Sequence, residues 1–193
     1  MNINLSPKPS LAIFIALCSL LRPLPSLAQV CNPNALITTP THRFIDNSDG
    51  VIIDTKNHLI WQKCVDGRTG VNCETGVTQT YSWQAALQRA ENLNNTTGFA
   101  GFVDWRLPNA KELLSIMERS CMDPALNLQV FPISSNGADL WSSTPNIDPI
   151  NTNDKALVAG FSGLGSLTDT FKIHPRAIRL VRTLTPNPAI NAN

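Results

Sequence analysis

Four cysteines follow the first 28 residues of the chain, and those 28 residues have the pattern of an export signal. Residues 11–21 form an uncharged apolar run after Lys8, prolines then end the run, and residues 26–28 supply small side chains for cleavage. A membrane span needs about 20 apolar residues, so the run is too short to be an anchor. Cleavage also removes Cys18, and the even number of remaining cysteines predicts two disulfides in an exported protein.

Three pairings of these four cysteines are possible, and the sequence favours one of them. Cys64 and Cys73 close a short loop rich in turn-forming residues, which leaves Cys31 to pair with Cys121. The second bridge would tie an N-terminal arm, residues 29–42, to the middle of the domain. A zinc site is the alternative, but eight residues separate Cys64 from Cys73 and no histidine lies near either, which is not a typical zinc-ligand spacing.

Charge and composition limit the classes of function. The chain has 15 basic and 14 acidic residues, and removal of Lys8 and Arg22 leaves 13 and 14. This balance argues against a nucleic-acid partner or a polybasic membrane surface. An apolar fraction of 42% is enough for the core of one domain, which we expect over residues 43–183. A second long apolar run is not found in the sequence, so we expect no transmembrane anchor. Residues 184–193 lack apolar periodicity, and we expect a disordered tail.

Apolar periodicity predicts an α+β fold. Residues 43–46, 51–54 and 59–62 are short runs separated by turn formers, typical of an antiparallel meander. Helices are expected over residues 83–93, after an N-cap at Ser82, and after Asn109, where Glu112 completes a variant of the capping box. Further strands are expected at the ranges 140–143, 156–161, 167–173 and 177–182. Strands and helices that are segregated along the chain indicate α+β and not alternating βαβ units.

Candidate ligand-binding residues lie in the last third of the chain. Residues 144–154 form a polar loop, Trp141 precedes it, and a basic stretch follows in which strand alternation places Lys172 and His174 on one face. Amides and an aromatic ring suit sugar hydroxyls and ring faces, and an exposed basic face suits sulfate or carboxylate groups. A solvated strand face and a core tryptophan are the alternatives. The candidate residues are Trp141, Asn146, Asp148, Asn151, Asn153, Lys172, His174 and Arg176.

Metal and catalytic chemistry find little support. Residues 46–50 have calcium-binding residue types, but the register of the EF-hand pattern fails, and a hairpin turn explains them. No nucleophile elbow, P-loop or paired-carboxylate spacing is present. Since the predicted disulfides occupy every cysteine after residue 28, we expect no thiol nucleophile, no catalysis and no cofactor, with calcium left open.

The segment from Asp104 to Glu112 has two interpretations. Arg106 beside Trp105 is either a contact for an anion or a structural group paired with Asp104 or Glu112. Alternation places Trp105 on a different face from Arg106, and Pro108 stops any strand before the second helix. A tryptophan next to a capped helix favours the structural interpretation.

A series of motifs, taken in order, resembles the C-terminal domain family of the Legionella collagen-like adhesin. They are Arg43-Phe44-Ile45-Asp46-Asn47 with Asp49-Gly50, Leu59-Ile60-Trp61-Gln62-Lys63-Cys64, Trp83-Gln84-Ala85-Ala86, Asp104-Trp105-Arg106-Leu107-Pro108, Lys111-Glu112-Leu113, Phe131-Pro132, Leu140-Trp141-Ser142-Ser143-Thr144 and Ile178-Arg179-Leu180-Val181-Arg182. The resemblance implies a C-type-lectin-like module of two helices, an antiparallel sheet and long loops. It also implies an exported or cell-surface protein, and in the adhesin a trimeric domain that binds sulfated glycosaminoglycans.

The function expected from these observations is recognition of a glycan or a surface protein by an exported, non-catalytic, adhesion-type module, with homo-oligomerisation possible. Thr144-Pro145-Asn146 lacks the acidic residue of the calcium-and-sugar motif in animal C-type lectins. One alternative is a structural subunit of an envelope assembly. Another is an enzyme related to the formylglycine-generating group, which uses a pair of free cysteines and copper.

Overall fold

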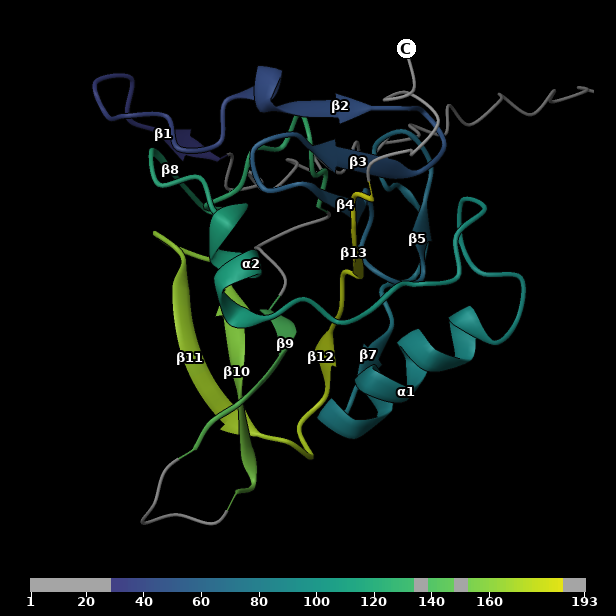
Figure 1. The fold of residues 1–193 in the computed structure, drawn as a ribbon. Helices are drawn as coiled ribbons and strands as arrows, with labels where there is room; N and C mark the ends of the chain where they lie inside the picture. Colours follow the sequence, from purple (N-terminus) through teal and green to yellow (C-terminus); the bar gives the residue numbers. More distant parts are fainter. Residues whose placement is uncertain (1–28, 134–138, 148–152, 186–193) are drawn as a thin grey trace, which may run out of the picture.

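A computed structural model describes residues 29–133, 139–147 and 153–185. In these residues the chain forms a mixed α+β fold that is mostly sheet, as predicted. A four-stranded sheet and a five-stranded sheet dominate it, and two further strand pairs are short. Figure 1 shows β2, β3 and β4 above the strands β9–β12. The elements are β1 (Val30–Cys31), η1 (Thr41–Arg43), β2 (Phe44–Asp46), β3 (Val51–Asp54), β4 (Leu59–Gln62), β5 (Arg68–Thr69), β6 (Thr75–Gly76), β7 (Thr80–Tyr81), α1 (Trp83–Asn94), α2 (Ala110–Ser115), β8 (Cys121–Met122), β9 (Asp139–Pro145), β10 (Lys155–Gly160), β11 (Ser166–Phe171), β12 (Arg176–Ala177) and β13 (Val181–Thr183).

The predicted meander is confirmed. Strands β2, β3 and β4 pair antiparallel in sequence order, and β13 adds to the far side of β4 to give the order β13-β4-β3-β2. The larger sheet has the order β11-β10-β9-β12-β7, so β7 joins strands from the last third of the chain.

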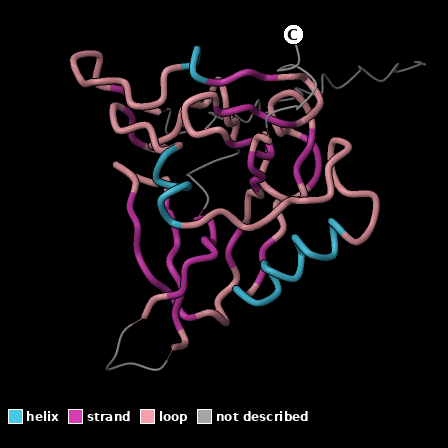
Figure 2. Tube along the Cα trace, in the orientation of Figure 1, coloured by secondary structure: helices cyan, strands magenta, loops and turns pink. Residues whose placement is uncertain are grey.

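Both helices begin where the sequence predicts. The Ser82 side chain accepts a hydrogen bond from the backbone N–H of Ala85, and Asn109 with Glu112 forms a complete capping box. A long loop connects α1 to α2 and crosses the molecule between them (Figure 2). It carries Trp105, which is 2% exposed.

The five-stranded sheet separates two hydrophobic clusters. Leu140 of β9 packs in one cluster with residues of and after α2, whereas the next residue, Trp141, packs in the other with α1. Because consecutive strand residues point to opposite faces, α1 and α2 cover opposite faces of this sheet.

Both predicted disulfides are confirmed. Cys31 bonds to Cys121 and Cys64 to Cys73, across 90 and 9 residues of sequence. The first bridge fixes the N-terminal arm, and β1 pairs antiparallel with β8 at the same place.

The prediction of one strand over residues 177–182 is wrong. β12 ends at Ala177 in the five-stranded sheet, and β13 begins at Val181 in the four-stranded sheet. Between them Arg179 is fully buried, and its Nη1 donates hydrogen bonds to the carbonyls of Gln62 and Lys63. Burial lowers the pKa of Arg179 to about 9. This linker therefore joins the two sheets through buried contacts.

The strand expected over residues 167–173 also differs. β11 ends at Phe171, and Lys172 and His174 lie in the turn that follows. The alternation that would place these two side chains on one strand face therefore does not apply.

Candidate functional site

Several of the predicted ligand residues gather after β9 and β11. The Asn146 amide donates to Asp169 Oδ2 at 2.6 Å, and Lys172 Nζ donates to the carbonyl of Asn153. Lys172 Nζ also lies 4.5 Å from the ring centroid of Trp83. His174 Nδ1 is 3.0 Å from Thr170 Oγ1. Asp148 and Asn151 lie outside the described residues.

Two other candidates lie elsewhere. Trp141 is 0% exposed, and its Nε1 donates to the carbonyl of Tyr81, so the structure contradicts its assignment as a ligand contact and confirms its alternative as a core residue. Arg176 pairs with Asp139 at 3.5 Å, at the start of β9, whereas Asn146 follows its end. The basic residues of the last third are thus not one open face.

The structural interpretation of Arg106 is confirmed. Its guanidinium forms two hydrogen bonds to the Glu112 carboxylate, at 2.7 and 2.8 Å, while Asp104 pairs with Arg182. Hydrogen bonding to Glu112 outweighs burial and raises the pKa of Arg106. Trp105 is buried in the core, in the same cluster as Leu107.

A cavity of about 660 Å³ lies beside the loop closed by Cys64 and Cys73, and we call it the disulfide-loop pocket. Three segments line it: the turn between β2 and β3, the chain from Gln62 through the disulfide loop, and α1 with the loop that follows. The lining residues are Asp46, residues 48–50, residues 62–71, Arg89, Leu93 and Phe99.

Glycine allows the disulfide loop to pack closely against the segment that follows it. Gly67 has φ +86°, and a Cβ atom there would lie 2.2 Å from the carbonyl oxygen of Val77. The same close approach lets Arg68 pair with Gly76 across β5 and β6. The disulfide then closes the loop, so this wall of the pocket is held by both a strand pair and a covalent bond.

Two ion pairs lie at the pocket. Lys63 Nζ bonds to Asp46 Oδ2 at 2.7 Å, and Arg89 forms two hydrogen bonds to Asp66, at 3.0 and 3.1 Å. Burial opposes ionisation of Asp46, but bonds from Lys63 and from the backbone of Ser48 still lower its pKa. Tyr81 donates to Asp66 at 2.5 Å, and burial together with this bond raises the pKa of Tyr81 to about 12.

Phe99 provides an aromatic wall. Its Cζ lies 3.0 Å from the position of a Cβ on Gly50, so only glycine lets the ring approach the β2–β3 turn this closely. On its other side the ring packs edge-on against Trp105, with 5.6 Å between centroids, and Trp105 Nε1 donates to the carbonyl of Phe99. The position of the ring is therefore fixed from both sides.

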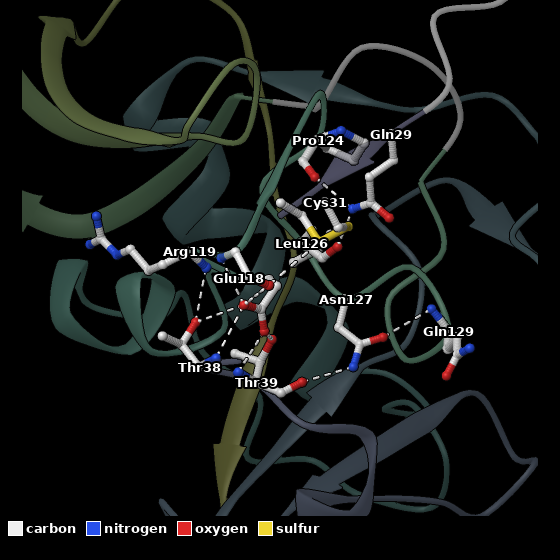
Figure 3. Close-up of a disulfide and its surroundings, with 12 residues drawn as sticks. Gln29, Cys31, Thr38, Thr39, Glu118, Arg119, Pro124, Leu126, Asn127 and Gln129 are labelled. Atoms are coloured by element: carbon white, nitrogen blue, oxygen red, sulfur yellow. Dashed lines mark hydrogen bonds between the residues drawn. A yellow bond between two sulfur atoms is a disulfide. The ribbon is translucent and has the colours of Figure 1, made fainter. Parts of the chain in front are cut away.

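A second, smaller cavity of about 370 Å³ lies under the N-terminal arm, next to Cys31–Cys121. Here Glu118 is 3% exposed and accepts hydrogen bonds from Thr38, Thr39 and Ser120, as Figure 3 shows for the two threonines. Burial alone would raise the pKa of Glu118, but these donors together lower it to about 2. Gln29 also donates from its amide to the carbonyls of Pro124 and Leu126 (Figure 3). These contacts fasten the arm.

No cluster of three or more histidine, cysteine or acidic side chains suited to a metal ion occurs in the described ranges. In the same residues no helix is both long enough and apolar enough to cross a bilayer.

Sequence reasoning missed the disulfide-loop pocket. The sequence predicts a hairpin turn at residues 46–50 and a short turn-rich loop between Cys64 and Cys73, and it gives no sign that these two segments meet. The glycines between the two cysteines signal a tight loop, but no periodicity indicates that α1 and Phe99 pack beside it. The pocket arises from tertiary packing.

Comparison with known proteins identifies the family. No curated protein matches the chain. The model of the Lcl C-terminal domain matches residues 50–182, which is more than half of the chain, and this range contains most of the motifs named above. Both disulfides agree with an exported protein, and the family suggests an adhesin-like module. The chain therefore belongs to the Lcl C-terminal domain family.

Proposed function

We propose that this protein is an exported, adhesin-type module with a C-type-lectin-like scaffold that recognises carbohydrate through the disulfide-loop pocket. The observation that carries the proposal is the pocket itself. It is large enough for one or two sugar rings, it has hydrogen-bonding groups of both kinds, and it presents the Phe99 ring. A rigid scaffold that presents loops in this way suits recognition.

The charge of the pocket favours a neutral sugar. Its three carboxylates, on Asp46, Asp49 and Asp66, are matched by three cations, on Lys63, Arg68 and Arg89. A sulfate group would lie close to these carboxylates, whereas hydroxyl groups both donate to carboxylates and accept from cations. We therefore favour a neutral glycan over the acidic glycan that the basic stretch suggested.

Binding without catalysis is the simplest role for this chain. The formylglycine-generating chemistry needs two free thiols, and the four cysteines in the described residues are all bridged. Removal of residues 1–28 as a signal peptide, and a place in the periplasm, at the cell surface or outside the cell, belong to the proposal. A structural subunit of an envelope assembly is the second candidate, since the exposed side chains of β11 could contact a neighbour.

A glycan array probed with the oxidised protein at low and high salt tests the proposal. We expect retention of neutral glycans that changes little with salt. Asp49→Ser should weaken it, because a serine hydroxyl can replace Asp49 Oδ1 as acceptor for the Val51 N–H while the second carboxylate oxygen is lost. Lys172→Ala is the matched control outside the pocket and should bind like the wild type. Absence of any bound glycan would refute carbohydrate recognition, and loss of binding in Lys172→Ala would move the site to the turn after β11.

A further inference from the structure

The disulfide-loop pocket has both apolar and polar residues in its lining. Leu93 and Phe99 are partly buried against the cluster that contains α1, and Val65 is 3% exposed. Phe99 lies directly against Gly50, the residue after Asp49. An apolar wall thus adjoins the Asp49 carboxylate. Such a combination favours a neutral sugar that carries both an apolar group and a hydrogen-bond donor.

Hydrogen-bonding capacity remains on the polar side. Within the described residues Asp49 accepts one bond, at Oδ1, from Val51, so its second oxygen has no partner there. Arg89 bonds to Asp66 through Nε and Nη2, which leaves Nη1. Lys63 Nζ carries three hydrogens and forms one bond, to Asp46. One acceptor and two donors therefore remain for a ligand.

We infer that the pocket binds the acetamido group of an N-acetylated sugar, an inference that rests on the proposed function and specifies its ligand class. An acetamido group has one methyl group, one N–H donor and one carbonyl acceptor. The methyl group packs on Phe99 and Leu93, the N–H donates to Asp49, and the carbonyl accepts from Lys63 or Arg89. Each group meets a partner that the described residues leave available.

Sugars that carry a hydroxyl group or a free amino group in place of the acetamido group fit this pocket less well. A 2-hydroxyl group in place of the acetamido group leaves the apolar wall without contact, so about one buried methyl group of hydrophobic free energy is lost. A free 2-amino group is cationic, and it would approach Lys63 and Arg89 as well as Asp49. The pocket therefore discriminates against glucose through the missing acetyl group and against glucosamine through the charge of its amino group.

Saturation-transfer NMR on the oxidised full protein tests this inference with N-acetylglucosamine, glucose and glucosamine as probes. We expect the strongest saturation at the acetyl methyl protons, and an affinity for N-acetylglucosamine about fourfold above that for glucose, which is the equivalent of one buried methyl group. Phe99→Leu keeps an apolar contact with Trp105 but should abolish the preference for the acetylated sugar. Phe171→Leu, which changes a 47% exposed ring on β11, is the matched control and should keep it.

The outcomes distinguish a failure of the acetamido assignment from a failure of carbohydrate binding itself. Equal affinity for glucose and N-acetylglucosamine, or a preference that survives in both Phe99→Leu and Asp49→Ser, would overturn the acetamido assignment and leave carbohydrate binding intact. Failure of all three sugars together with an empty glycan array would overturn both.

Discussion

Substitution of Glu118 by glutamine should destabilise the attachment of the N-terminal arm, residues 29–42, to the rest of the domain. The carboxylate accepts from three backbone N–H groups and three hydroxyls of Thr38, Thr39 and Ser120, at 2.6 to 3.3 Å. A glutamine amide directs its own N–H groups at one side of this ring of donors. Hydroxyls can rotate to accept, but a backbone N–H cannot, so at least one buried donor loses its partner.

The size of the effect follows from the pKa of Glu118. The pKa falls from an ordinary value of 4.5 to about 2, and each unit is worth about 1.4 kcal/mol, so the ionised form contributes about 3 kcal/mol. Because the pKa is lowered on folding, this contribution is complete above pH 4.5 and is lost as the pH falls toward 2. The wild type and Glu118→Gln should therefore differ by about 3 kcal/mol at pH 7 and converge at low pH.

Urea unfolding of the oxidised proteins between pH 7 and pH 2 measures this difference. Hydrogen exchange at the Thr38 and Thr39 amides reports local release of the arm, which the Cys31–Cys121 bridge still tethers. Glu91→Gln, at an exposed position of α1, is the matched control and should change little at any pH. A difference that stays constant from pH 7 to pH 2, or none at pH 7, would refute this account of Glu118.

Three further predictions concern the scaffold. Replacing both cysteines of the Cys31–Cys121 bridge by serine should lower the free energy of unfolding by about 2 kcal/mol more than the same change at Cys64–Cys73, because the Cys31–Cys121 bridge closes the longer loop. Calorimetry of both variants checks this order. Asp54→Asn should destabilise by about 3–5 kcal/mol in chemical denaturation, because it leaves Arg43 buried without its ion-pair partner; a loss below about 1 kcal/mol would contradict this. Gly67→Ala should reduce thermal stability far more than Gly101→Ala, since both have positive φ but only Gly67 has a backbone atom in the way; equal melting temperatures would contradict the clash.

Local signals predicted the fold where neighbouring residues determine it. The capping box at Asn109 and the meander through Leu59 depend on side chains a few positions apart, and both are present. The stretch around Arg179 could not be predicted in the same way. Arg179 is buried because its guanidinium meets carbonyls more than 100 residues earlier in the chain, and no local pattern encodes that contact.

The candidate site was predicted less well than the fold, for the same reason. Polar residue types pointed to Asn146 and Lys172, which do lie among contacts after β9 and β11. Trp141 is a suitable residue type for a sugar, but α1 covers it. The disulfide-loop pocket needs Asp49 and Phe99 side by side, and only the folded chain brings them together.

We propose that the disulfide-loop pocket of the oxidised protein binds carbohydrate. Titration calorimetry of the oxidised protein with the glycan retained most strongly on the array, set beside Asp49→Ser and Lys172→Ala, tests it most directly. We expect saturable binding that Asp49→Ser weakens at least tenfold and that Lys172→Ala leaves unchanged. Wild-type affinity in Asp49→Ser, with the fold intact, would contradict it.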